Sequence, residues 1–213
     1  MFNALSRCLP YRGASTPVNH SLTSFNNVRL PLDALLGNLD TSLSPHQDFL
    51  LSIWRVSVGT LSLAMIAVPA LQISSYISFS YSKRRLVRGK GQEHLPIFQF
   101  RTQQIPVYTA ISRAYVLKAF GIMASRLFSD SMISLPTRHA IATAFKVVTI
   151  RLCQDSQIML ADRCGAQGLF DFNQISQYFV STETSSCIYF ISFSERDKGY
   201  FYCGGRHSRT FNS

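Results

Sequence analysis

The sequence has few charged residues, and acidic ones are the scarcest. Charged residues make up 15% of the 213 residues, and 11 Asp and Glu stand against 21 Lys and Arg, for a formal net charge of +10. This excess favours an anionic partner such as nucleic acid, acidic lipid or a phosphate-rich cofactor, without choosing among them. Because hydrophobic residues reach 46%, the chain has enough apolar material for a core and is not disordered throughout.

Common metal, disulfide and catalytic patterns are also absent. The five cysteines contain no CxxC pair, which argues against a disulfide framework or a zinc site. The five histidines are scattered without an i, i+4 pair, and no G-x-S-x-G, phosphate-binding-loop or Rossmann glycine motif occurs. No recognised nucleic-acid-binding motif accompanies the basic residues. The sequence therefore predicts no metal ligands and no nucleic-acid partner.

Targeting patterns are missing at both ends. The first twelve residues lack the continuous apolar segment of a secretory signal. The last four residues, T-F-N-S, do not form a peroxisomal address. An odd, irregular set of cysteines is typical of a reducing compartment. We expect an intracellular protein.

Three long segments have the start and stop patterns of α-helices. Ser44 before Pro45, with Gln47 three residues after the serine, forms an N-cap with a capping box. The expected helices run from 45 to about 85, from 102 to about 130 and from 136 to about 164. Alternation in residues 22–30 adds one strand, which Pro31 ends. The predicted fold is mainly α, an up-and-down bundle of long helices with a short β appendage.

Residues 56–82 raise a membrane alternative. They contain no charged residue, exceed the ~20 residues needed to span a bilayer, and precede a basic run at 83–90 that resembles a positive-inside flank. Against a span stand Pro69, Gln72 and seven serines, and a helix buried on most sides also appears apolar all round. We favour a buried helix and keep a basic membrane-anchored protein as an alternative.

Three segments together carry a resemblance to one enzyme family. Residues 25–31 and 34–37, F-N-N-V-R-L-P and A-L-L-G, resemble the F-x-N-V-R-V-P-x-x-x-L-L-G stretch that closes the middle β-domain of acyl-CoA dehydrogenases and acyl-CoA oxidases. Residues 78–85 and 97–104 are similar to two stretches of the oxidase branch, A-x-x-Y-S-x-x-R and Y-Q-T-Q-Q. Residues 164–169, C-G-A-Q-G-L, resemble the C-G-G-x-G-Y turn, with Ala166 and Leu169 departing from it.

The resemblance covers about residues 17–179 and implies a domain organisation. Residues 1–42 would be a remnant of the middle β-domain, 43–179 most of the C-terminal helical domain, and 180–213 a divergent, disordered tail. The implied activity is FAD-dependent α,β-dehydrogenation of an acyl-CoA. The resemblance also implies homo- or hetero-oligomers formed through the helical domain. It further implies a peroxisomal location and, for some members, a role in secondary metabolism.

The resemblance also implies cofactor-binding residues. Arg85 stands where the family places an arginine on the FAD pyrophosphate, and its guanidinium offers a fork of donors to phosphate. The alternative is a solvated helix end. Gln103 matches a glutamine directed at the cofactor, with Gln104 as the neighbouring alternative. Gly165 and Gly168 would let backbone approach the adenosine half of FAD, or would simply form a helix C-terminal turn.

The catalytic base of the family has no counterpart in this sequence. Counting from the glycine turn leads to Tyr189, and the nearest carboxylates, Glu183 and Glu195, do not precede a glycine. We therefore expect no catalytic residue in this chain, and an inactive remnant or a dimerisation partner stays open as an alternative. The acyl substrate and the choice between dehydrogenase and oxidase stay open too.

Two geometric expectations follow. Arg85 and Gln103 should border one open groove. Three residues of the first helix should be buried against residues of the other two: Ala64, Ile66 and Leu71 against Ala119, Ile141 and Val148.

Overall fold

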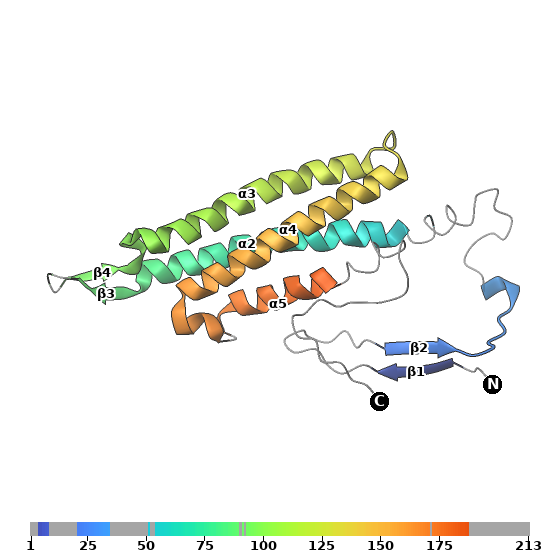
Figure 1. Cartoon of the computed structure of the whole chain (residues 1–213), viewed down its shortest axis with the longest axis horizontal. Helices are drawn as coiled ribbons and strands as arrows, with labels where there is room; N and C mark the ends of the chain where they lie inside the picture. Colours follow the sequence, from blue (N-terminus) through green and yellow to red (C-terminus); the bar gives the residue numbers. More distant parts are fainter. Residues whose placement is uncertain are drawn as a thin grey trace, which may run out of the picture.

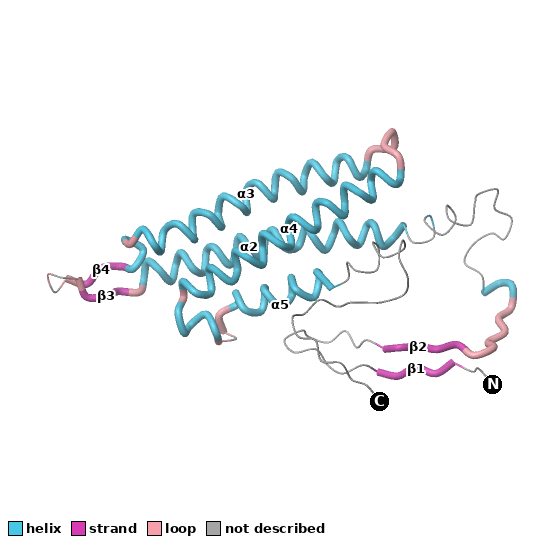
Figure 2. Tube along the Cα trace, in the orientation of Figure 1, coloured by secondary structure: helices cyan, strands magenta, loops and turns pink. Residues whose placement is uncertain are grey.

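The computed structural model describes residues 4–8, 21–34, 51, 54–89, 91, 93–170 and 172–187, and most of these are helical (Figure 2). The α-helices among them are α2 (Trp54–Arg84), α3 (Arg101–Ser129), α4 (Leu135–Arg163) and α5 (Gln174–Cys187). Helices α2, α3 and α4 run up and down side by side, and α5 lies along α2 and α4 (Figure 1). The predicted mainly α bundle of long helices is confirmed.

Two small antiparallel hairpins and three short turns complete the described elements. Strand β1 (Ala4–Cys8) pairs with β2 (Ser21–Phe25), and β3 (Leu86–Arg88) pairs with β4 (His94–Pro96). The 3-10 turns are η1 (Leu32–Ala34), η2 (Ile97–Gln99) and η3 (Gly165–Leu169). The short β appendage is present, but β2 ends at Phe25 and not at residue 30. Asn27 has a φ of 49°, which an extended strand does not allow.

Helix α2 owes its position in the bundle to small residues. Its buried face is rich in Ala and Ser, so neighbouring helices can approach closely. Some of the buried serines satisfy their hydroxyls inside the helix: Ser74 donates to the carbonyl of Ala70 and Ser75 to that of Leu71, each at 2.8 Å. Ser57 and Ser78 instead bond to His139 and to the Leu160 carbonyl on α4. A serine-rich helix can therefore be buried without unsatisfied hydroxyl groups.

By length and composition, α2 is the one helix in the described residues that could cross a membrane. In the bundle, however, it contacts α3, α4 and α5, and Ala64 and Leu71 are fully buried. Packing against these three helices buries one side of α2, and 39% of its apolar 18-residue window is buried. The expected burial on most sides is therefore only partly confirmed.

The core consists of two clusters along the bundle. One contains Leu71, Val107, Leu117, Leu160 and Ile175, so it joins all four helices. The other contains Leu61, Ala64, Ala124, Phe128 and Phe145, and Trp54 stacks on Phe128 with 5.0 Å between ring centroids. The first cluster packs all four helices together, and the second packs α2, α3 and α4.

The expected contacts of α2 are only partly correct. Ala64 and Leu71 are buried, whereas Ile66 is 64% exposed. Two positions along a helix correspond to a rotation of about 200°, so Ile66 lies on the side of α2 opposite Ala64. Ala119 and Val148 also face outward, and Ile141 is partly buried against the second core cluster.

The expected boundary after residue 179 falls inside α5. Residues 180–187 lack a helical period, yet they continue the helix. Thr182 is buried and donates a hydrogen bond to Oε1 of Gln157 on α4 at 3.0 Å. The expected disorder is wrong for these residues, because a tertiary contact supports the helix where local pattern does not. The expected tail at 188–213 and the expected helix start at Pro45 lie outside the described residues.

Candidate functional site

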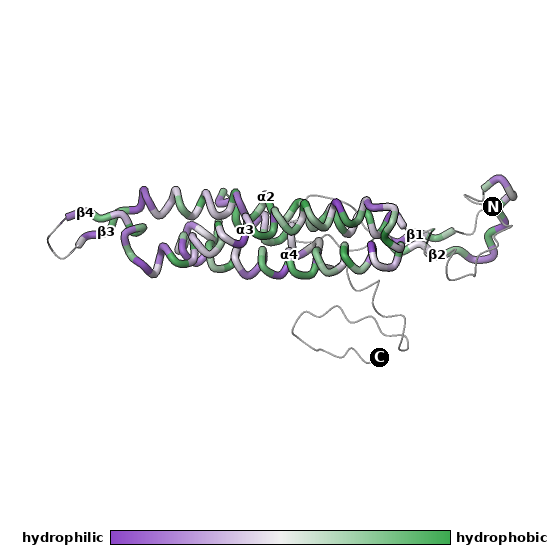
Figure 3. Tube along the Cα trace, turned by 90° about the horizontal axis from the view of Figure 1, so that it is seen from above, coloured by the Kyte–Doolittle hydropathy of each residue, from purple (hydrophilic) through white to green (hydrophobic). Residues whose placement is uncertain are grey.

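The four residues expected to bind cofactor gather at one end of the bundle. Arg85 directly follows α2, Gln103 lies in the first turn of α3, and Gly165 and Gly168 belong to η3 after α4. These ends of α2, α3 and α4 meet beside the β3–β4 hairpin (Figure 1). Hydrophilic residues are frequent at this end (Figure 3).

Gln103 links the three long helices at this end. Its Nε2 donates to Oγ of Ser82 on α2 at 2.8 Å and to the carbonyl oxygen of Arg163 on α4 at 2.9 Å. Both N–H groups of the amide are thereby used, and only Oε1 is left for any other partner. Since Gln103 is 8% exposed, the expectation that it borders an open groove is wrong.

Arg85 has a fixed backbone and an exposed side chain. Its N–H donates to the carbonyl of Tyr81 at 2.8 Å, and its own carbonyl accepts from the N–H of Ile97 at 2.9 Å. The guanidinium is exposed beside Lys83 and Arg84, and within the described residues it has no ion-pair partner. A free fork of donors in a basic setting suits a phosphate group.

The two glycines are explained by the turn they form. Gly165 follows Cys164, the C-cap residue of α4, with a φ of 59°, the left-handed conformation in which glycine commonly ends a helix. A Cβ on Gly168 would clash with the backbone carbonyl of Ala161, so a side chain there would push η3 away from α4. Around Gly165 the space is open.

These four residues fit FAD poorly as a group. Arg85 and Gly165 are accessible, whereas Gln103 and Gly168 are occupied by contacts within the bundle. In the described part of the chain they form no cradle that could enclose a dinucleotide. The arrangement fits only the phosphate portion of such a ligand, at Arg85.

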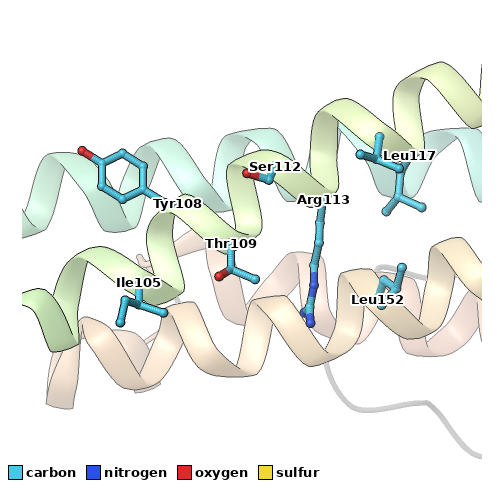
Figure 4. A pocket seen from close by; sticks show the side chains of 8 residues that line it. Ile105, Tyr108, Thr109, Ser112, Arg113, Leu117 and Leu152 are labelled. Atoms are coloured by element: carbon cyan, nitrogen blue, oxygen red, sulfur yellow. The ribbon is translucent and has the colours of Figure 1, made fainter.

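A shallow groove lies on another surface, along α3 and α4 (Figure 4). It has a volume of about 530 Å³ and is lined mainly by apolar side chains, including Ile105, Val116 and Leu152. Arg113 is its charged member, held by a 2.9 Å hydrogen bond from Nη1 to Oγ of Ser156. Sequence analysis missed this groove, because Leu152 of α4 completes its lining only when α4 packs against α3.

Nucleophilic and metal chemistry find little support in the described residues. Burial raises the pKa of the Cys153 thiol to about 12 and also raises that of Cys164, so neither supplies a thiolate near neutral pH. No group of three or more metal-ligating side chains occurs in the part of the chain that is described. The strongest perturbation of a basic group is at Lys146, where burial lowers the pKa to about 8.

Comparison with known proteins identifies the fold. No protein-family model and no curated protein matches the sequence. Among solved structures, acyl-CoA oxidase 1 of Arabidopsis thaliana superposes on 88% of the chain with a TM-score of 0.72 and 20% identity. Butyryl-CoA dehydrogenase of Megasphaera elsdenii covers 88% at a TM-score of 0.67 and 13% identity, and an acyl-CoA dehydrogenase of Geobacillus kaustophilus covers 86% at 0.67 and 14%. The bundle has the acyl-CoA dehydrogenase fold.

The chain spans less than half the length of these proteins with the acyl-CoA dehydrogenase fold. It corresponds to 31% of the Arabidopsis oxidase, 45% of the Megasphaera dehydrogenase and 44% of the Geobacillus dehydrogenase. The resemblance found in the sequence is thus confirmed at the level of the fold.

Replacing Gln103 tests whether it holds the helix ends of this acyl-CoA dehydrogenase-fold bundle together. We expect Gln103→Leu to lower the free energy of unfolding by about 1–2 kcal/mol, because the part-buried carbonyl oxygen of Arg163 and the buried hydroxyl of Ser82 lose their donor. Gln104→Leu is the matched control: no hydrogen bond of its side chain is described, and a change within about 0.5 kcal/mol is expected. Urea unfolding followed by circular dichroism measures both. Equal effects of the two substitutions would contradict the linking role of Gln103.

Proposed function

We propose that this chain derives from the helical part of a flavin-dependent acyl-CoA dehydrogenase or oxidase. The parental reaction is FAD-dependent α,β-dehydrogenation of an acyl-CoA, and the present role is association with another polypeptide through the helices. The observation that carries the proposal is the superposition of 88% of the chain on an acyl-CoA oxidase at a TM-score of 0.72. The motif resemblances at residues 25–37, 78–85, 97–104 and 164–169 support it independently of the fold.

The cofactor part of the proposal depends on Arg85. Its exposed guanidinium lies at the end of a basic segment, where it could meet a phosphate group. Because Gln103 and Gly168 are used within the bundle, a complete FAD site needs groups from a second polypeptide. The 213-residue chain alone is therefore expected to bind FAD weakly or not at all.

The parental reaction requires a catalytic base, which the sequence does not supply at the expected position. Removal of an α-proton needs a carboxylate within hydrogen-bonding reach of that proton. Glu183 lies exposed on α5, away from the helix ends that carry Arg85, and Tyr189 and Glu195 lie outside the described residues. We therefore assign acyl-CoA dehydrogenation to the ancestor of this chain, and association through the helices to the chain itself.

We expect the purified chain to show no flavin absorbance and no turnover. The assay supplies added FAD, an artificial electron acceptor and acyl-CoAs of several chain lengths, with an intact acyl-CoA oxidase as the positive control. Turnover above the background of free FAD would refute the proposed inactivity. It would then place Glu183 or Glu195 in the role of base, which Glu183→Gln and Glu195→Gln separate.

The packing of α2 within the bundle argues against a membrane-anchored protein. Alkaline carbonate extraction should release the chain from membranes, and retention in the pellet would reverse this conclusion. Peroxisomal location is proposed on the family resemblance alone, and imaging of a fluorescent fusion would test it.

A further inference from the structure

The turn between α4 and α5 exposes three large apolar side chains. Leu169 is 82% exposed, Phe170 53% and Phe172 73%, and we call these three residues the apolar loop. The two phenylalanine rings stack on each other, with 5.6 Å between their centroids and 11° between their planes. Single exposed apolar residues are normal on a protein surface, but a cluster of three in four positions marks a candidate interaction site.

Packed residues on either side hold the apolar loop in place. Before it, Gly168 lies against the backbone of Ala161, where a Cβ would clash. After it, the N–H of Asn173 donates to the carbonyl of Phe170 at 2.9 Å, and Oδ1 of Asn173 accepts from the N–H of Ile175 at 3.3 Å. Asn173 is 7% exposed and Ile175 is fully buried. The outward position of the three apolar side chains is therefore set by the fold of the turn.

The same end of the bundle carries exposed basic residues, which we call the basic end. They come from the end of α2, strand β3 and the start of α3: Lys83, Arg84, Arg85, Arg88 and Arg101. Arg163, the last residue of α4, connects this group to the apolar loop, because its Nη1 donates to the carbonyl of Thr102 at 3.4 Å and η3 begins two residues later. In Figure 1 the β3–β4 hairpin and the turn between α4 and α5 lie at this one end.

Few acidic groups oppose these basic residues. In the described part of this end they are Glu93, beside β4, and Asp162, in the last turn of α4. Asp171 stands between the two phenylalanines in the sequence and lies outside the described residues. The basic side chains thus outnumber the carboxylates, and the excess positive charge attracts an anionic surface.

We propose that this end of the bundle binds the surface of an anionic lipid bilayer. The apolar loop enters the boundary between headgroups and acyl chains, and the basic end lies against the anionic headgroups. Stable attachment of this kind requires an apolar anchor together with a basic patch, and the fold places both at one end. The long helices stay packed, so the chain lies on one leaflet and does not span the bilayer. The proposal depends neither on the parental activity nor on FAD.

The composition of the apolar loop favours lipid over nucleic acid. Leu169, the most exposed of the three residues, has no polar group for a base or a phosphate, and its burial in hydrocarbon is favourable. Nucleic-acid surfaces use free aromatic faces on which bases stack. Phe170 and Phe172 instead cover one face of each other.

Co-sedimentation with lipid vesicles tests the proposal. The anionic vesicles contain about 30% phosphatidylserine in phosphatidylcholine, and vesicles of pure phosphatidylcholine are the neutral reference. We expect the chain to bind the anionic vesicles at least about 20-fold more strongly, and binding to fall about 10-fold or more between roughly 0.05 and 0.5 M NaCl, because salt screens the headgroup charge. Equal binding to both kinds of vesicle would overturn the proposal, as would no binding at about 1 mM lipid.

Leu169→Ser/Phe172→Ser tests the apolar loop. The double substitution is expected to lower binding to anionic vesicles by about 10-fold or more, because two apolar side chains no longer insert. The matched control is Tyr115→Ser/Val116→Ser in the middle of α3, where the side chains are 68% and 67% exposed. The control is expected to leave binding unchanged, and an equal loss in both variants would contradict insertion of the loop.

Arg84→Gln/Arg88→Gln tests the basic end and leaves Arg85 intact. Each basic residue near an anionic surface strengthens binding by roughly five-fold, so the pair should weaken binding to anionic vesicles by about 20-fold. Lys118→Gln/Arg126→Gln removes two exposed charges of α3 and should change binding by less than about three-fold. Equal losses in the two variants would show attraction by net charge alone and would overturn the proposal.

A fluorescent reporter detects insertion directly. The chain has one tryptophan, Trp54, so Phe172→Trp in a Trp54→Phe background places a single indole in the apolar loop. Its emission should shift to the blue with anionic vesicles and stay unchanged with neutral ones, and circular dichroism should show unchanged helix content in all variants. Vesicle-bound protein without a blue shift would overturn insertion. Tighter binding to a single-stranded oligonucleotide would overturn the proposal in favour of nucleic acid. A dimer in sedimentation velocity that Leu169→Ser/Phe172→Ser abolishes would overturn it in favour of a second copy.

Discussion

Leu71→Ala is expected to lower the free energy of unfolding by about 2–5 kcal/mol. Leu71 lies on α2 with 0% exposure and packs in the core cluster that joins α2 to α3, α4 and α5. Truncation removes the transfer energy of the lost methyl groups and leaves a cavity, because the neighbouring helices cannot close in fully. Urea unfolding followed by circular dichroism, analysed by linear extrapolation, measures the change.

Ile66→Ala on the same helix is the control for Leu71→Ala. Ile66 is exposed on the opposite side of α2, so its truncation leaves no cavity and should change stability by less than about 1 kcal/mol. Measurements should be made at a protein concentration where the wild-type chain has one oligomeric state, since association shifts apparent stability. A loss below about 1 kcal/mol for Leu71→Ala would mean that α2 is not packed in the bundle as described.

Lys146→Met is expected to stabilise the protein at pH 7 by roughly 1–3 kcal/mol. Lys146 is 1% exposed on α4, and burial lowers the pKa of its ammonium group from 10.5 to about 8. The charged form is therefore disfavoured in the folded state relative to the unfolded one. Each pKa unit corresponds to about 1.4 kcal/mol, and the expected gain is set lower because Met cannot reproduce the polar interactions of the lysine.

The free energy of unfolding is expected to change with pH in a defined direction. Between pH 8 and 10.5 the unfolded chain keeps its proton at Lys146 while the folded chain loses it, so the stability of the wild type rises with pH through this window. Below pH 8 both states are protonated and the full penalty is present. The difference between the wild-type and Lys146→Met stability curves should therefore shrink from pH 8 to 10.5.

Lys118→Met controls for loss of charge alone. Lys118 is an exposed lysine on α3, and its replacement should change stability by no more than about 0.5 kcal/mol at any pH in this range. Urea unfolding at half-unit pH intervals supplies the curves. If Lys146→Met and Lys118→Met behave alike, the ammonium group of Lys146 is not buried as described.

The second and third long helices were predicted from sequence to within one residue at each end. The expected ranges 102–130 and 136–164 became α3 (Arg101–Ser129) and α4 (Leu135–Arg163). The signals are local: Pro136 occupies the first turn of α4 after Ser134, and Gly165 ends that helix with a positive φ. Such features depend on the backbone within one turn, so a sequence contains them explicitly.

The orientation of α2 was less accessible from sequence. Residues 56–82 are apolar or small on all sides, so their periodicity does not distinguish the buried side from the exposed one. Ala64 and Leu71 were placed correctly, but Ile66 was not. Which side of α2 is buried is determined by its packing against α3 and α4.

The residues of the candidate site were predictable from sequence, but the contacts they make were not. Sequence resemblance selected Arg85, Gln103, Gly165 and Gly168, and the fold does bring them to one end of the bundle. Their present contacts were not predictable, because the partners of Gln103 are Ser82, 21 residues earlier, and the Arg163 carbonyl, 60 residues later. A motif identifies residue types, whereas the bonds those residues make depend on which distant segments come into reach.

Helix boundaries, the helical class of the fold and the family resemblance were thus present in the linear chain, because each depends on residues a few positions apart. Packing between distant segments determined which face of α2 is buried and why residues 180–187 are helical. It also determined that Gln103 is a link between helices and that an apolar groove lies along α3 and α4. These properties depend on contacts such as Ser57 with His139 at 2.7 Å and Thr182 with Gln157 at 3.0 Å, across 82 and 25 residues of chain. Local conformational preference cannot specify such pairs, since the energy of burial depends on what fills the space beside a residue and not on its neighbours in sequence.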